Sequence, residues 1–200
     1  MAHKSSLLLI MLLLLGMPLT AQKSVLHPYF LGGYQFTAVS SSVDYRPSGG
    51  FRVGAGVDIG LGGSGMVGYS FSPSVNFSKK GFNFLLPSMD YVADTRIGYE
   101  LTDLYYVDMP LLLDAYLETR PGMGFHGNVG PYVGYLINAS GDGDGSELKK
   151  FDYGLQVGGG FEYYHWLLMV GLQYGLQNIS SGSDHSYNNR ILYLTVGYRF

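Results

Sequence analysis

Hydrophobic and polar residues alternate along most of this chain with a period of two, which is typical of β-strands whose two faces meet different environments. The segment from Phe51 to Leu61 shows the alternation most clearly. One face holds Phe51, Val53, Ala55, Val57, Ile59 and Leu61, and the other holds Arg52, Gly54, Gly56, Asp58 and Gly60. Because the charges fall on one face, we expect a strand with an apolar side and a small or polar side.

Seven further segments follow the same rule, which predicts eight strands. They are Pro28–Ser40, Val67–Phe77, Val107–Glu118, Phe125–Ile137, Tyr153–Tyr163, Trp166–Gln177 and Ile191–Phe200. The alternation is least regular in the first of them, where Phe30, Tyr34, Phe36 and Ala38 are expected to share the apolar face. Strands of soluble proteins usually have about five or six residues, whereas a strand tilted by about 45° needs roughly 9 to 11 residues to cross a bilayer. The lengths therefore favour membrane-spanning strands.

The connections between these strands alternate between short and long. The short ones are Gly62–Gly65, Thr119–Gly122 and Tyr164–His165, and the long ones are Ser41–Gly50, Lys79–Tyr99, Asn138–Lys150 and Asn178–Asn189. Lipid cannot satisfy an open sheet edge, so spanning strands must close into a barrel. Short turns of outer-membrane barrels face the periplasm and long loops face outward. We therefore predict an eight-stranded, antiparallel, up-and-down barrel of the outer membrane with periplasmic termini.

The composition supports this class of protein. Charged residues make up only 14% of the chain, with 30 Gly and 18 Tyr, which fits neither a helical bundle nor a disordered segment. A soluble eight-stranded barrel is the alternative, but its outer surface would need more Lys and Glu. The net charge of −3 and the lack of a basic stripe argue against nucleic acid as a partner.

The first 21 residues differ from the rest of the chain. A polar start with Lys4 precedes an unbroken apolar run over Leu7–Leu15, and the small residues Thr20 and Ala21 come before Gln22. The run is too short for a spanning helix, so residues 1–21 are predicted to be a cleaved signal peptide and residues 22–200 the barrel domain. The chain has no Cys, and so no lipidation site at this junction and no disulfide framework.

The polar faces are expected to point into the barrel lumen. By this assignment the lumen holds Arg52, Asp58, Asp108, Asp114, Gln156, Glu162, Gln173 and Arg199. Side chains fill a barrel of eight strands, so we expect a hydrogen-bonded plug and no general diffusion pore. Arg199 is predicted to pair with Glu162 or Glu118 near the periplasmic end; an Arg199 that faced lipid would overturn the register of the last strand.

The sequence gives little support to catalysis, and we expect no catalytic or cofactor-binding residues. A lipid hydrolase or acyltransferase would need His with Ser and a carboxylate. His126 lies on the lumen side near a short turn and His165 lies in a turn, and neither has a Ser and an acid beside it in the sequence. His185 has Ser183, Asp184 and Ser186 nearby, but a polar loop between strands is the simpler explanation of this cluster.

The segment from Asp142 to Ser146 resembles the start of a calcium loop. Tyr153 stands where the last position of such a loop requires Glu, so we interpret the segment as a flexible outward loop and predict no metal site; calcium binding at the cell surface is the weaker alternative.

The last strand ends on an aromatic residue. Phe200 follows Leu192, Leu194, Val196 and Tyr198 at alternate positions. This pattern resembles the C-terminal signal that the barrel-assembly machinery reads, although any last lipid-facing strand would share it. We expect the machinery to be a partner of this strand.

Several motifs together resemble the outer-membrane β-barrel domain of Bacteroidetes that is often called PorT-like. They are Tyr106–Leu113, Gly130–Gly134, Asp152–Leu155 with Gly158–Gly160, Tyr174–Asn178 and Gly197–Phe200. The likeness covers essentially the whole chain after residue 21, with Asp108 and Met109 where the family pattern has Glu and Ile. It implies an outer-membrane location and no enzymatic activity.

The resemblance also bears on the role of the protein. The eponymous family member is associated with protein export across the outer membrane, so we expect a secretion or assembly accessory, or a surface-interaction protein that acts through its rim and loops. Two alternatives stay open: a lipid-modifying enzyme, with His and Ser converging on the lipid-facing rim, and a narrow small-solute channel, with a continuous water path through the lumen.

Overall fold

The computed structural model describes residues 26–40, 46–85, 99–140, 149–177 and 188–200, and these residues form eight β-strands. The strands are β1 (Leu26–Ser40), β2 (Arg46–Ser64), β3 (Val67–Leu85), β4 (Tyr99–Arg120), β5 (Met123–Ser140), β6 (Phe151–Tyr163), β7 (Trp166–Gly175) and β8 (Asn188–Arg199). Among the described residues, no helix is long and apolar enough to span a membrane.

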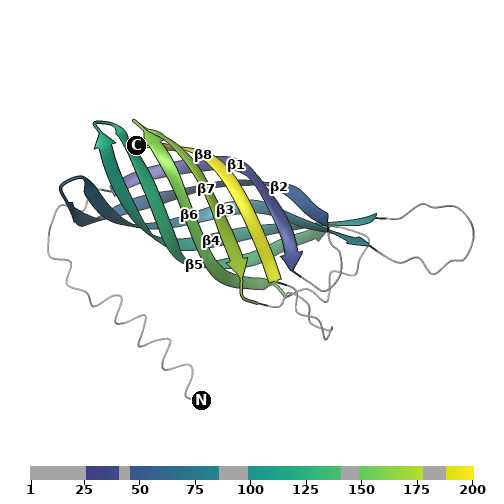
Figure 1. Cartoon of the computed structure of the whole chain (residues 1–200). Helices are drawn as coiled ribbons and strands as arrows, with labels where there is room; N and C mark the ends of the chain where they lie inside the picture. The colour runs from purple at the N-terminus through teal and green to yellow at the C-terminus, as the bar shows by residue number, and fades with distance from the viewer. Residues whose placement is uncertain (1–25, 41–45, 86–98, 141–148, 178–187) are drawn as a thin grey trace, which may run out of the picture.

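The strands close into one antiparallel barrel in which each strand pairs with its neighbours in sequence and β1 pairs with β8 (Figure 1). The predicted all-β, up-and-down topology is therefore confirmed. Three tight turns lie at one end of the barrel, at Gly65–Met66, Pro121–Gly122 and Tyr164–His165. Gly65 and Gly122 have φ of 62° and 76°, a conformation that favours glycine. We call this end the turn end and the opposite end the loop end.

Both chain ends of the barrel lie at the turn end. Tyr29 pairs with Arg199 across the seam between the first and last strands, and the Phe200 N–H donates to the Pro28 carbonyl at 2.9 Å. Outside the barrel at this point, the Phe200 ring lies 5.3 Å from Phe30 and 5.0 Å from Tyr198. The aromatic end of the chain thus fastens the seam.

Burial follows the predicted period of two. Along β5 the side chains alternate between exposed and buried, so that Phe125 and Val129 point outward and His126 and Asn128 point inward. The outward residues form an apolar belt around the barrel, and most inward residues are polar or charged. The molecule is therefore apolar on the outside and polar on the inside, as the alternation predicts for strands in lipid.

Some predicted boundaries are wrong, chiefly at the loop end. Residues 79–85 were expected in a loop, but they belong to β3, whose pairing with β4 runs on from Lys79↔Tyr105 to Leu85↔Tyr99. The second strand also starts earlier than expected, at Arg46. These extensions continue the backbone ladder after the apolar face ends, so the alternation that marks a lipid-facing strand does not reveal them.

Some sequence predictions fall outside the described residues. The expected signal peptide at residues 1–21, the cluster around His185 and the loop from Asp142 to Asp144 and Ser146 are among them.

Candidate functional site: the charged lumen

Asp108 of β4 is the centre of the first of two groups of charged side chains inside the barrel. Its carboxylate accepts a bond from Lys80 Nζ at 2.7 Å and another from Ser78 Oγ at 2.7 Å, and Arg52 Nη2 lies 3.8 Å away. Lys80 and Asp108 are almost wholly buried. Burial of a charge is costly unless the charge is paired, and here two cations share one buried carboxylate.

The same group extends across the barrel to other strands. Lys80 Nζ lies 3.6 Å from the Asp152 carboxylate and 4.4 Å from the centre of the Tyr106 ring. The Tyr132 hydroxyl donates to Asp152 at 3.3 Å. These contacts bring β5 and β6 into the network.

Arg52 of β2 completes the group by reaching across the lumen to β7. It donates to Gln173 Oε1, and Gln173 Nε2 donates to Gln156 at 2.7 Å. The Arg52 guanidinium also lies 4.6 Å from the centre of the Tyr193 ring. We call this group the central layer: it joins β2 through β8 and consists of Arg52, Ser78, Lys80, Tyr106, Asp108, Tyr132, Asp152, Gln156, Gln173 and Tyr193.

A second group lies nearer the turn end, and we call it the turn-end layer. It runs from strand to strand through Ser72, Asp58, Arg199, Glu162, His126 and Asp114. Arg199 contacts Glu162 and also lies 3.3 Å from Asp58. His126 places Nδ1 2.8 Å from Asp114 and Nε2 2.8 Å from Glu162, an arrangement that lets both ring nitrogens donate only in the imidazolium form.

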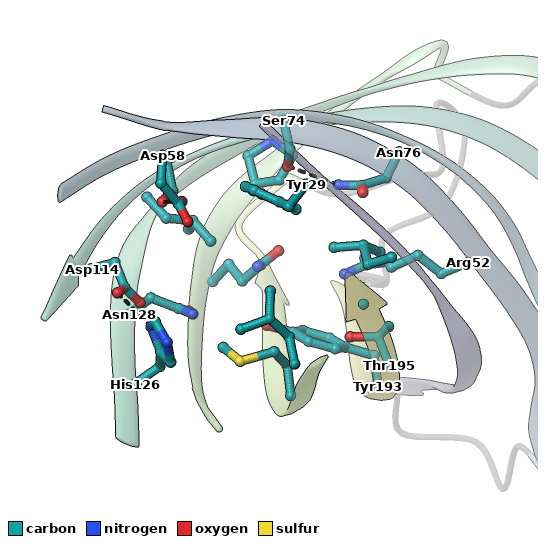
Figure 2. A pocket seen from close by; sticks show the side chains of 18 residues that line it. Tyr29, Arg52, Asp58, Ser74, Asn76, Asp114, His126, Asn128, Tyr193 and Thr195 are labelled. Carbon is teal, nitrogen blue, oxygen red and sulfur yellow. Dashed lines mark hydrogen bonds and ion pairs between the residues drawn. The ribbon is translucent and has the colours of Figure 1, made fainter. Parts of the chain in front are cut away.

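A cavity of about 70 Å³ separates the two layers (Figure 2). Arg52 borders it on one side, and Asp58, Asp114 and His126 border it on the other. A water molecule needs roughly 10–15 Å³ of such space, so the cavity has room for a small group of water molecules. The lumen therefore consists of two ion-pair layers with one polar chamber between them.

The predicted set of lumen-facing residues is confirmed. All eight predicted residues face inward. Arg199 pairs with Glu162, one of the two expected partners, whereas Glu118 is exposed at the turn end. The second partner of Arg199, Asp58, was not expected.

The prediction missed Lys80 and Asp152, both of which are central to the network. Lys80 was assigned to a loop, but the alternation that places Asn76 and Ser78 inward would have placed it inward as well. Asp152 has the same parity as Gln156 and was missed because the strand was started at Tyr153.

The described histidines do not form the constellation that a lipid-modifying enzyme would need. His126 is held between two carboxylates inside the lumen. His27 Nδ1 lies 3.2 Å from the Phe200 carbonyl oxygen, and His165 Nδ1 lies 2.9 Å from the Arg199 carbonyl oxygen. Within the described part of the chain, no group of three or more His, Cys, Asp or Glu side chains could hold a metal ion.

Comparisons with known proteins agree with this architecture. The sequence profile of the family described as outer membrane protein beta-barrel domain matches residues 21–181. No curated protein is similar enough in sequence to count as a match. Among solved structures, OprG from Pseudomonas aeruginosa is 15% identical, with a TM-score of 0.52 over 88% of this chain and 97% of that chain.

Two other solved barrels are more distant in shape. Ail of Yersinia pestis, crystallised with the heparin analogue sucrose octasulfate, is 13% identical, with a TM-score of 0.44 over 88% of this chain and 99% of that chain. Neisserial surface protein A is 13% identical, with a TM-score of 0.41 over 86% of this chain and 97% of that chain. At these identities, the likeness to solved structures concerns the fold alone.

Proposed function

Because the chain belongs to the outer membrane protein β-barrel domain family and is an integral outer-membrane barrel, we propose that it acts through the rim at its loop end and not as a channel along the barrel axis. The observation that carries this proposal is the pair of ion-pair layers across the interior. A solute that moved along the barrel axis would have to displace the buried contacts of Asp108 and then those of Arg199. Such contacts join strands across the interior and stabilise the barrel wall.

The rim itself is uneven, which favours an interaction role. The pairing of β3 with β4 continues for seven residue pairs beyond Ser78↔Tyr106, as far as Leu85↔Tyr99. In contrast, β7 has only 10 residues and β4 has 22. The β3 and β4 ends therefore project past the rest of the barrel (Figure 1). We call residues 82–85 and 99–102 the projecting hairpin ends.

We further propose that the turn end and both chain ends face the periplasm, since short turns of outer-membrane barrels lie on that side. The projecting hairpin ends then point outward. The motifs around Asp108 and Gly130 support a PorT-like barrel of Bacteroidetes, and with it a role as an accessory to protein secretion or assembly, or as a surface-interaction protein. The partner is expected to be a protein that contacts the outer rim.

The rim proposal is tested by photocrosslinking in the host. A photoreactive residue at Tyr105 lies on the outward face near the loop end, and one at Leu113 lies in the apolar belt as a matched control. We expect a discrete protein adduct from Tyr105 and none from Leu113. Lipid adducts alone at both positions would contradict the proposal.

A truncation isolates the contribution of the hairpin. Gly81 and Asp103 are direct partners in the register, so a two-residue Asn-Gly turn can join them in place of residues 82–102. We expect the truncated barrel to keep its heat-modifiable migration on gels and to lose the Tyr105 adduct. Stepwise ion conductance by the full-length protein in planar bilayers would instead favour a channel.

A further inference from the structure

Three prolines occupy the middle of three consecutive strands. They are Pro73 in β3, Pro110 in β4 and Pro131 in β5. A proline has no backbone N–H, so in a sheet it is normally confined to edge strands or bulges. A closed barrel has no edge, so each of these prolines removes a donor from a ladder that has strands on both sides.

The ladders are interrupted at these prolines. Pairing stops between Gly56↔Ser74 and Ile59↔Phe71, between Pro73↔Leu111 and Asn76↔Asp108, and between Pro110↔Tyr132 and Leu113↔Val129. At each gap the register resumes without a shift, so no residue is inserted. No such in-register gap occurs in the other five ladders over the described residues. We call the three adjoining gaps the proline band.

The cavity between the two charged layers lies directly behind this band. Ser72, Ser74, Pro110 and Leu112 belong to the interrupted segments, and all four line the cavity. The wall between cavity and bilayer therefore lacks part of its hydrogen bonding where the chamber touches it. Unpaired backbone groups are costly in lipid, so this part of the wall opens at lower cost than the continuous ladders do.

A molecule in the cavity would meet a higher barrier along the barrel axis than through the wall at the proline band. Arg52 and its partners in the central layer cross the lumen on one side of the cavity, and Arg199, Glu162 and His126 of the turn-end layer cross it on the other. Separation of a buried ion pair leaves uncompensated charges in the interior, so either layer is a higher barrier than a few missing backbone bonds.

The cavity lining mixes apolar and polar side chains. Leu31, Leu167 and Met169 supply apolar surface from β1 and β7. Asn76 and Asn128 are at least nine-tenths buried and also line the cavity, and within the described part of the chain their Oδ1 atoms have no hydrogen-bond partner (Figure 2). Free acceptor oxygens in a lining that also holds Leu31, Leu167 and Met169 suit a small molecule with a hydrogen-bond donor at one end and a short apolar part at the other.

From these observations we infer that the proline band is a lateral portal, through which a small amphiphile with a donor head group passes between the bilayer and the internal cavity. The band supplies the weak wall, and the cavity supplies a chamber that the ion-pair layers close along the axis. Passage needs only the parting of β2, β3, β4 and β5 along the proline band. This inference is independent of any partner at the rim.

The test uses a single reactive thiol in the cavity, because the natural chain has no Cys. Thr195 is buried, lines the cavity from β8, away from the band, and is similar in size to Cys, so Thr195→Cys is the reporter. The protein is reconstituted in phospholipid vesicles. Labelling by methyl methanethiosulfonate, which is small, uncharged and soluble in the bilayer, is compared with labelling by a trimethylammonium thiosulfonate confined to water. We expect the uncharged reagent to label the thiol and the charged reagent not to do so.

Restoring the backbone N–H donors that Pro73 and Pro131 lack should slow passage through the portal. Pro73→Val and Pro131→Val replace outward-facing side chains and leave the lumen unchanged. Each restored backbone bond should slow labelling by about fivefold, the factor that corresponds to a typical net hydrogen bond. Pro28→Val is the matched control, since Pro28 also faces outward but lies in an uninterrupted ladder, and it should leave the rate unchanged.

Heat-modifiable migration identifies the variants that have folded. If a variant that carries both Pro73→Val and Pro131→Val does not fold, the two single variants are compared instead. Equal labelling by the charged reagent, or a rate that neither proline substitution changes, would show that the cavity exchanges along the axis and would overturn the inference.

Discussion

Removal of Arg199 should lower the stability of the barrel at the seam where β1 meets β8. It lies on the last strand, which is hydrogen-bonded to β1 and β7, yet its guanidinium reaches past both neighbours to Asp58 on β2 and Glu162 on β6. The contact with Asp58 crosses the seam, so it exists only when the first and last strands have come together. Arg199→Met keeps much of the side-chain volume and removes both ion pairs.

The expected loss of stability follows from the two carboxylates that remain without Arg199. Among the described contacts, loss of Arg199 leaves Glu162 with only His126 as a cationic partner and Asp58 with only the Ser72 hydroxyl. Loss of one member of a buried pair typically costs about 3–5 kcal/mol, and the 18% exposure of the Arg199 side chain admits some solvent. We therefore expect the free energy of unfolding to fall by about 2–4 kcal/mol.

The assay is urea unfolding in lipid vesicles, followed by gel migration of the unboiled protein. Arg190→Met is the matched control, because Arg190 is exposed at the loop end and bonds only to the Tyr174 hydroxyl among the described contacts; its loss should cost less than about 1 kcal/mol. Adding Glu162→Gln to Arg199→Met should recover part of the loss, since one uncompensated charge disappears. Equal effects of Arg190→Met and Arg199→Met would refute the reasoning.

Three further outcomes are expected. Asp108→Asn should lower the free energy of unfolding by about 3–5 kcal/mol, because Lys80 and Arg52 lose their shared carboxylate, and urea titration measures the change; a loss below about 1 kcal/mol would contradict the central layer. Gly154→Ala should destabilise the barrel by about 1–3 kcal/mol, because the added Cβ would lie 2.0 Å from a backbone carbonyl oxygen, and the same titration would contradict this if Gly154→Ala were neutral. A Cβ at Gly127 would face open space on the outer surface, so Gly127→Ala should change the free energy of unfolding by less than about 0.5 kcal/mol in the same titration. A larger loss would contradict the open space at this position.

The outer surface and the inward-facing residues could be predicted from the sequence because each depends on a local rule. In a spanning strand, lipid requires an apolar residue at every second position, and the residues between must face the lumen. Arg52 and Asp58 could therefore be assigned to the lumen from their own strand alone. Lys80 follows the same alternation as Asn76 and Ser78, but it was missed because the apolar face ends at Phe77 and the predicted strand was ended there.

The partners of the lumen residues were harder to predict. Arg199 was matched with Glu162 because both were assigned to the same end of the barrel, but Asp58 was missed. Contacts across a closed barrel depend on the tilt of the strands and the stagger between them, which no single strand encodes. The proline band escaped prediction for the same reason: Pro73, Pro110 and Pro131 become neighbours only once the register of three ladders is fixed.

The strict inward and outward alternation of the strands has a consequence for how this chain can change length. From Asp103 to Leu117, the odd-numbered residues of β4 face outward and the even-numbered ones inward. Deletion of one residue in the middle of β4 would turn Asp108 or Asp114 toward lipid and bring leucines into the lumen, whereas deletion of two would restore the facing of both. Insertions and deletions in the membrane segment should therefore survive in evolution mainly in pairs, and odd changes in length should be confined to the connections at the loop end.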